Sequence, residues 1–238
     1  MWVFWWEVTF FVADHCMPHD SSMTCEVIAR ALERVKDIAR ERQIPVPPEF
    51  VLWTDNTPRE NKNSIVIAYL IVLVGRMMFR FSAMMNYPKG HSHGILDQLF
   101  GVISRAMQSV TRISDIADLV QKIEYFLRRP ALRQWFGEDT RVCVVHLTSV
   151  RNWKAYFGAL RINYAGGMKT DITAIHCWMF MLRKDLPANV RVTAAGQDFP
   201  PHPLDVIALT KQWVTDAGRM LSLHVARGAA IEGVAAIE

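Results

Sequence analysis

The sequence contains no pair of cysteines in C-x-x-C spacing. Its four cysteines are widely separated: Cys16, Cys25, Cys143 and Cys177. This distribution fits a reducing compartment better than a disulfide framework. A zinc site formed by Cys16, Cys25 and the histidines His15 and His19 would offer ordinary zinc ligands. Their spacing matches no established zinc motif, so the pattern favours reduced cysteines over a metal centre.

No apolar run in the chain is long enough to suggest a membrane span. Residues 65–74 are apolar but too few to cross a bilayer, and they are typical of a buried helix. The first eleven residues are rich in Trp and Phe, carry Glu7, and lack both a basic segment and a small-residue cleavage site. They predict a strand and no signal peptide. We therefore expect a soluble intracellular protein, nuclear or cytoplasmic, with no membrane partner.

Motifs for nucleophilic catalysis are also missing. The sequence has no G-x-S-x-G elbow, and none of its cysteines has an evident His-Asp partner set. Gly166-Gly167 lacks the following Lys-Ser/Thr of a phosphate-binding loop. These absences argue against serine or cysteine hydrolases and against P-loop nucleotide binding.

The composition is that of a globular protein with a substantial core. The chain has 238 residues, 51% of them hydrophobic and 21% charged, which suits one full domain or a domain with an appendage. The formal net charge is +4, and the isoelectric point is about 9.0. This mildly basic balance permits a nucleic-acid partner without requiring one.

Hydrophobic periodicity predicts alternating strands and helices, and hence a mixed α/β layer structure. In the first half of the chain, we expect strands at 2–13, 50–54 and 78–85, and helices at 24–39, 64–74, 95–107 and 114–129. Thr24 is the predicted N-cap of the first helix, with Glu26 in its first turn. Beyond Pro130, the pattern predicts strands at 142–147 and 175–182 and a final helix at 205–226.

The central stretch concentrates the polar side chains that suggest chemistry. Phe50-Val51-Leu52-Trp53-Thr54 is a continuous apolar run, as expected for a central strand covered on both faces. Asp55 follows it directly, at the strand end where open α/β sheets bind ligands. A second apolar run leads to His91-Ser92-His93 and then to Asp97 on the next helix. Polar groups so close to a core must be satisfied or used.

Two motifs in this stretch resemble a known family. Asp55-Asn56-Thr57-Pro58-Arg59-Glu60-Asn61-Lys62-Asn63 and Gly90-His91-Ser92-His93-Gly94-Ile95-Leu96-Asp97 are similar to the D-N-x4-N-K-N and G-H-T-H-x2-I-D motifs of a transposon-derived domain of unknown function. The resemblance covers residues 8–107. That family resembles the integrase/transposase branch of the ribonuclease H-like fold. The implied fold is therefore a ribonuclease H-like mixed sheet flanked by helices, at residues 1–130, with an α+β extension at 131–238.

The resemblance implies divalent-metal-dependent cleavage or transfer of DNA strands. Asp55 and Asp97 would be the catalytic carboxylates that hold Mg²⁺ or Mn²⁺, with His91 and His93 as further ligands or orienting donors. Five residues would contact nucleic acid or fix the loop: Asn56, Asn61, Lys62, Asn63 and Lys89. The implied partner is DNA, and the domain is compatible with a homo-oligomer.

The chain departs from the family pattern at two places. No Asp precedes Asp14, so the first acid of a triad would have to be Glu7 or Asp14, and the chain is expected to lack the fold's first strand. Gly94 and Ile95 replace acidic residues that follow the His pair. The alternative function is a catalytically inactive, transposon-derived module that binds nucleic acid or protein.

Simpler interpretations of the same residues stay open. Asp55 could cap its own turn, as Asp-Asn pairs often do. His91 and His93 could bond backbone groups of their loop, and Lys62 could be a solvated lysine at a helix start. A zinc hydrolase that uses His91, His93 and Asp97 is chemically adequate, although no general base is evident nearby.

Overall fold

The computed structural model describes residues 2–4, 7–55, 57–86, 95–130, 132, 140–158, 162–164, 177–186, 206–211 and 219–225. Contacts divide the chain into two compact units whose segments interleave along the sequence. Unit 1 comprises Met1–His19, Glu26–Pro45 and Gly90–Arg151. Unit 2 comprises Asp20–Cys25, Val46–Lys89 and Asn152–Glu238. Each unit is described below by itself.

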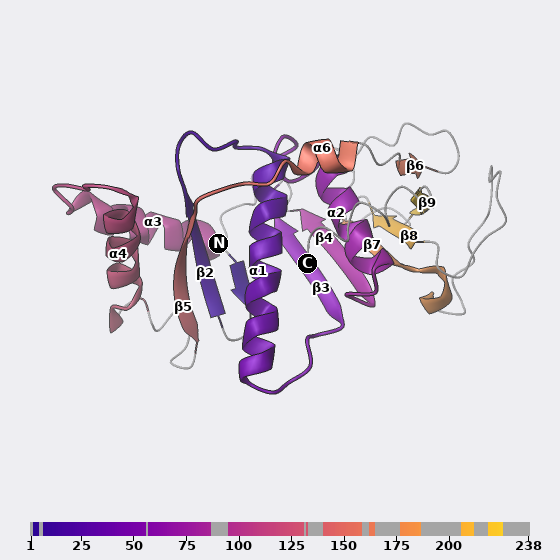
Figure 1. The fold of residues 1–238 in the computed structure, drawn as a ribbon, viewed down its shortest axis with the longest axis horizontal. Coiled ribbons are helices and arrows are strands. Elements are labelled where there is room, and N and C mark those ends of the chain that lie inside the picture. The colour runs from indigo at the N-terminus through magenta and orange to yellow at the C-terminus, as the bar shows by residue number, and fades with distance from the viewer. Residues whose placement is uncertain are drawn as a thin grey trace. The chain divides into compact units, whose positions relative to one another are not determined.

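Unit 1 is built on a three-stranded mixed sheet (Figure 1). Strand β1 (Trp2–Phe4) pairs antiparallel with β2 (Glu7–Ala13), and β2 pairs parallel with β5 (Arg141–Leu147). The strands predicted at 2–13 and 142–147 are therefore confirmed. A boundary near residue 130 stays a prediction, although β5, which follows that point, is the parallel neighbour of β2.

Helices α3 (Ile95–Gln108) and α4 (Ile116–Leu127) contribute to the unit 1 core. Alternate residues of β2 and β5 pack with these helices in one apolar cluster: Val8, Phe10, Leu99, Ile103, Leu127, Leu132 and Val144. Both helices lie within one or two residues of their predicted bounds, because their apolar residues recur at helical spacing.

Helix α1 (Ser21–Glu41) begins three residues earlier than predicted. The Asp20 carboxylate accepts a hydrogen bond from the backbone N–H of Ser22 at 2.8 Å, so Asp20 and not Thr24 caps the start of the helix. The Thr24 hydroxyl instead donates to Asn61. The prediction of Thr24 as the N-cap is therefore wrong, and the apolar stripe that follows it is confirmed.

Unit 2 contains a six-stranded mixed sheet with the order β3-β4-β7-β8-β9-β6. Its strands are β3 (Glu49–Thr54), β4 (Phe81–Asn86), β6 (Ile162–Tyr164), β7 (Cys177–Leu182), β8 (Val206–Lys211) and β9 (Arg219–Val225). A short 3₁₀ helix, η2 (Arg183–Asp185), follows β7. Strands β3 and β4 are parallel, and the remaining pairs are antiparallel. The carboxyl ends of β3 and β4 consequently lie side by side.

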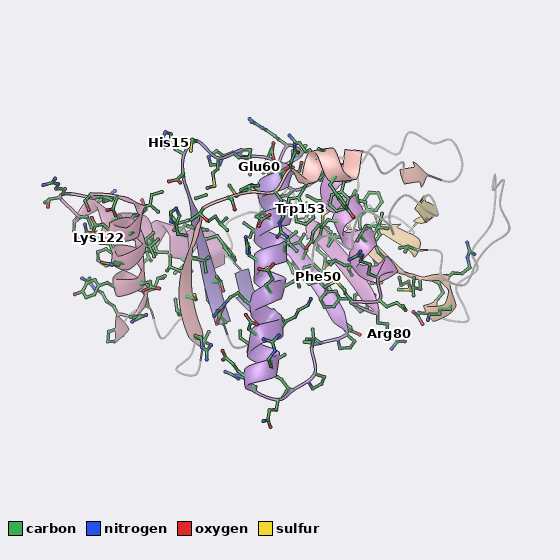
Figure 2. All side chains as sticks on the ribbon, in the orientation of Figure 1. His15, Phe50, Glu60, Arg80, Lys122 and Trp153 are labelled. Carbon is green, nitrogen blue, oxygen red and sulfur yellow. The ribbon has the colours of Figure 1, made fainter. Side chains whose placement is uncertain are left out.

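Helix α2 (Ser64–Gly75) packs on this sheet, in contact with β4, β7 and β8. Almost every residue from Val66 to Val74 is buried, as the unbroken apolar run predicts. Helix α6 (Trp153–Gly158) covers α2 in turn: the Tyr69 ring meets the rings of Trp153 and Phe157 edge-on at 5.2 and 5.9 Å. Figure 2 labels Trp153 at this contact.

Two predictions about the unit 2 sheet are wrong. Strand β3 is an edge strand and not a central one, with Val51 and Trp53 43% and 49% exposed on one face. Residues 206–211 and 219–225 form the antiparallel strands β8 and β9 instead of one helix. Their Leu and Ala content is compatible with a helix, but pairing with β7 determines the local structure.

The protein is thus of the α/β class, with mixed sheets flanked by helices. A closer likeness to the ribonuclease H-like fold stays a prediction. None of the helices in the described ranges is long and apolar enough to cross a membrane.

Candidate functional site at the β3–β4 edge

The Asp55 carboxylate lies exposed at the carboxyl end of β3 and is held there by two side chains. The Thr57 hydroxyl donates to Oδ2, and Nδ2 of Asn61 donates to Oδ1, each at 2.5 Å. A carboxylate has about four acceptor positions, so each oxygen has one left over after its bond to a described residue. The Asp55 side chain therefore binds Thr57 in its own turn, as the simpler interpretation proposed, and is at the same time an oriented, exposed carboxylate.

Asn61 and Asn63 fix the loop between β3 and α2. Asn61 binds Asp55 through Nδ2, and its Oδ1 accepts from the Thr24 hydroxyl at 3.1 Å. Asn63 is the N-cap of α2: its Oδ1 accepts from the amides of Ile65 and Val66. Its Nδ2 donates to the carbonyls of residues 58 and 59. The loop-fixing alternative is confirmed for both asparagines, and the amide of Asn63 is fully engaged.

Lys62 is a buried residue, only 1% exposed. The prediction of a solvated lysine at the helix start is therefore wrong. With so little exposed surface, the Lys62 side chain offers little contact to a phosphate in this conformation, and its role in nucleic-acid binding stays a prediction. Nothing in the sequence distinguishes it from an exposed lysine, because its burial depends on the tertiary packing of the loop.

Asn86, at the carboxyl end of β4, lies beside the Asp55 backbone and was not singled out by the sequence patterns. It is fully buried beside Thr54, its register partner on β3. Nδ2 donates to the Thr54 hydroxyl at 2.6 Å and to the backbone carbonyl of Asp55 at 3.3 Å. Oδ1 has no hydrogen-bond partner among the described residues. A buried amide oxygen left in this state costs about 1–3 kcal/mol.

Five of the predicted site residues have side chains outside the described part of the chain. These residues are Asn56, Lys89, His91, His93 and Asp97. The backbone of Asp97 is described and lies in the first turn of α3, as predicted. Asp97 belongs to unit 1 and Asp55 to unit 2. Among the described side chains, no group of three or more His, Cys, Asp or Glu could hold a metal ion.

Glu7 and Asp14, the two alternatives for a first acid, have different surroundings in unit 1. Glu7 is 2% exposed and forms a two-point ion pair with Arg34 at 2.9 and 2.6 Å. The hydrogen bond from Arg34 to Glu7 raises the pKa of the guanidinium. Asp14 follows β2 and lies 3.7 Å from Nε2 of His146, with both side chains about one-third exposed. Of the two acids, Asp14 is the one that solvent can reach.

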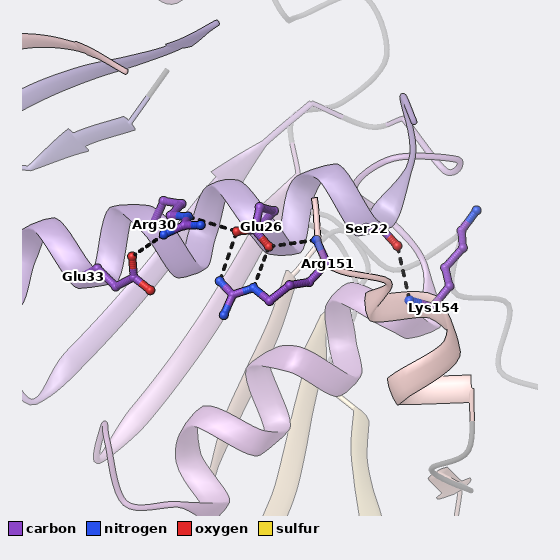
Figure 3. Close-up of polar contacts among 6 residues, drawn as sticks. All are labelled: Ser22, Glu26, Arg30, Glu33, Arg151 and Lys154. Atoms are coloured by element: carbon purple, nitrogen blue, oxygen red, sulfur yellow. Dashed lines mark hydrogen bonds and ion pairs between the residues drawn. The ribbon is translucent and has the colours of Figure 1, made fainter. Parts of the chain in front are cut away.

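Glu26 is a buried carboxylate of unit 1 that binds two arginines (Figure 3). The sequence pattern predicted only that it lies near a helix terminus. It is 0% exposed and accepts from Arg30 at 3.0 Å. Arg151 binds the same carboxylate through its backbone N–H, Nε and Nη2, at 3.3, 2.8 and 3.1 Å. In unit 2, the Ser22 hydroxyl accepts from the backbone N–H of Lys154 at 3.2 Å. Both contacts fix the segment that follows β5 against α1.

The zinc hypothesis for the first loop is wrong. Cys25 is fully buried in α1, whereas His15, Cys16 and His19 are exposed on the loop after β2. Figure 2 labels His15 on that loop. These side chains are all described and form no metal-binding group.

The chain matches one known protein family. The model of a family described as a domain of unknown function, DUF7869, matches residues 6–170. Comparison with curated proteins and with solved structures finds no match. The matched range contains Asp55, Asn61 and Asn86 and spans more than half of the chain. The chain therefore belongs to the DUF7869 family.

Proposed function

We propose that this chain is a transposase/integrase-like domain that cleaves or joins DNA strands with a divalent metal ion bound at Asp55. The observation that supports this proposal is the state of the Asp55 carboxylate: exposed, at the carboxyl end of a parallel strand pair, and held by Thr57 and Asn61. Ligands of open α/β sheets bind at this end of the strands.

The donor chemistry at Asp55 fits Mg²⁺ or Mn²⁺. Both ions prefer carboxylate oxygen, and Mg²⁺ is often held by one or two carboxylates while it keeps several water molecules. Hydrogen bonds from neighbours commonly orient such ligands, and Thr57 and Asn61 play that part here. A bound ion would activate the attacking oxygen and stabilise the leaving oxygen of a phosphodiester. Asp97, His91 and His93 remain the proposed further ligands.

DNA is the proposed partner because the chain is mildly basic. A net charge of +4 favours binding to a polyanion, and this attraction weakens as the salt concentration rises. A ribonuclease H-like core and an origin in a transposable element belong to the same proposal. They are supported by the two motifs and the α/β class.

A second candidate function is a non-catalytic module that binds nucleic acid or protein. It is supported by the contacts of the first motif. The side-chain amides of Asn61 and Asn63 form hydrogen bonds that fix the loop, and Lys62 is buried. A motif with these contacts would be needed for folding whether or not the domain cleaves DNA.

Nicking of supercoiled plasmid in the presence of Mn²⁺ distinguishes the two functions. We expect the native protein to convert the plasmid to open circles and Asp55→Asn to leave it intact while still binding DNA. Asp118→Asn, which removes the partly exposed carboxylate of α4 that pairs with Lys122, is the control and should nick at the native rate. Equal nicking by native protein and Asp55→Asn would contradict the first proposal. DNA binding without nicking by the native protein would support the second.

A further inference from the structure

Asn86 combines two features that are rarely found together in a folded protein. Its side chain is fully buried, yet Oδ1 has no hydrogen-bond partner among the described residues. Buried polar atoms are normally satisfied, and an exception calls for an explanation such as an ion or a bound water molecule. The position of Asn86 indicates which of these explanations applies.

The orientation of the Asn86 amide is fixed by its neighbours. The backbone carbonyl of Asp55 can only accept a hydrogen bond, so the group that faces it at 3.3 Å must be the NH₂ end of the amide. The Thr54 hydroxyl accepts from the same nitrogen at 2.6 Å. Turning the amide over would place two carbonyl oxygens against each other. Oδ1 is therefore the atom left without a partner among the described residues.

The unpartnered oxygen belongs to the same strand-end edge as the Asp55 carboxylate. Thr54 and Asn86 are register partners on parallel strands, and Asp55 is the next residue after Thr54. Asn86 thus binds the backbone of the residue whose side chain is the proposed metal ligand. An amide oxygen is a hard, neutral donor of the kind that Mg²⁺, Mn²⁺ and Ca²⁺ accept beside carboxylates.

We propose that Asn86 is a second oxygen donor of the Asp55 cation site. Its Oδ1 faces the ion or one of the ion's bound water molecules, while its Nδ2 holds the backbone of Asp55 in place. This inference rests on the proposed function, because it requires a divalent cation at Asp55. It adds a neutral ligand from β4 to a site whose first proposed donor follows β3.

Two substitutions test the inference through Mn²⁺ binding and thermal unfolding: one removes the donor oxygen of Asn86, and the other gives it a negative charge. Asn86→Leu removes the donor oxygen at similar volume, so the Kd for Mn²⁺ should rise about tenfold. Asn86→Asp adds a buried negative charge, which should lower the melting temperature of the ion-free protein. Because the added carboxylate would face the cation, Mn²⁺ should raise the melting temperature of Asn86→Asp more than that of the native protein.

Ser82→Ala on the same strand is the matched control. Ser82 is also fully buried, and its hydroxyl donates to the carbonyl of Leu70 at 3.1 Å, away from the strand ends. This variant should lose stability and keep the native Kd for Mn²⁺. The comparison separates loss of a buried hydrogen bond in β4 from loss of a metal ligand.

Paramagnetic broadening supplies a measurement on the native protein, which stays informative if a variant fails to fold. Substoichiometric Mn²⁺ should broaden the side-chain NH₂ signals of Asn86, identified by their absence from Asn86→Asp. Unbroadened signals, or native Kd values and melting shifts in both Asn86 variants, would overturn this inference. The proposed function would still stand in that case, provided that the native protein binds Mn²⁺ and Asp55→Ala does not. A native protein that binds no Mn²⁺ would overturn both proposals.

Discussion

Asn61 donates a hydrogen bond from Nδ2 to the carboxylate of Asp55, six residues before it in the sequence. This contact gives a physical reason for the D-N-x4-N spacing: the loop after β3 turns back so that its second asparagine orients the carboxylate that begins it. Asn61 is in turn held by the Thr24 hydroxyl of α1. The orientation of Asp55 thus depends on residues from two separate segments of unit 2.

Removing the Asn61 amide should disorder the Asp55 carboxylate. We expect Asn61→Leu to weaken Mn²⁺ binding about tenfold, as loss of an orienting group typically does. Calorimetric titration of Mn²⁺ measures the Kd. Asn63→Asp, which changes a neighbouring asparagine and leaves the Asp55 contacts in place, is the control. An unchanged Kd in Asn61→Leu would show that Asp55 needs no such support.

Asn63 should act on stability alone. Because its Oδ1 caps α2, Asn63→Ala should lower the free energy of unfolding by about 1 kcal/mol. Asn63→Asp retains the capping oxygen but loses the Nδ2 donor that binds the carbonyls of residues 58 and 59, so it should be destabilised through the loop instead of the cap. Urea denaturation gives both values, and a filter-binding assay should find native DNA affinity in each variant. A loss of DNA affinity without a loss of stability would restore the phosphate-contact interpretation.

Glu26 should be one of the most sensitive positions in unit 1. Glu26→Gln removes the charge that Arg30 and Arg151 share in a buried site, and we expect a loss of about 2–3 kcal/mol in unfolding free energy. Glu33→Gln breaks the exposed pair with Arg30 and should cost at most about 0.5 kcal/mol. Urea denaturation followed by tryptophan fluorescence compares the variants. Equal losses would mean that Glu26 contributes no more than a surface carboxylate.

Asp118 makes stability depend on pH in the acid range. Hydrogen bonds from Lys122 and from the backbone of Ser114 lower the pKa of Asp118 below its ordinary value of 3.8. A lowered folded-state pKa stabilises the protein at pH above 3.8 and loses this effect as the pH falls through the folded pKa. Asp118→Asn should therefore be less stable than the native protein at pH 6, and the difference should shrink below pH 3.8. A difference that is constant from pH 6 to pH 2 would contradict this assignment.

Local patterns predicted the elements whose stabilising contacts are mostly short-range. Helix α2 follows from an apolar run that starts after a capping asparagine, and β3 follows from its β-branched and aromatic residues. The position of Asp55 at a strand end follows from these two elements. Strands β8 and β9 were predicted as a helix, because composition does not reveal that β7 offers them a pairing edge.

The site residues that escaped prediction are those that tertiary packing defines. The sequence pattern predicted Glu26 as a first-turn glutamate, whereas the first turn of α1 contains no acid, and the Glu26 carboxylate is bound by Arg151, 125 residues later. Asn86 ends an apolar strand, and its role depends on the register of β4 against β3. The burial of Lys62 is likewise a property of the folded loop. Composition carries no signal for such contacts, because each joins segments that are distant in the sequence.

Calorimetric titration of Mn²⁺ into the native protein and into Asp55→Ala tests the central claim most directly. Circular dichroism and thermal unfolding would first establish that both proteins are folded. The account predicts micromolar binding by the native protein and none by Asp55→Ala. No binding by the folded native protein, or equal binding by Asp55→Ala, would contradict it.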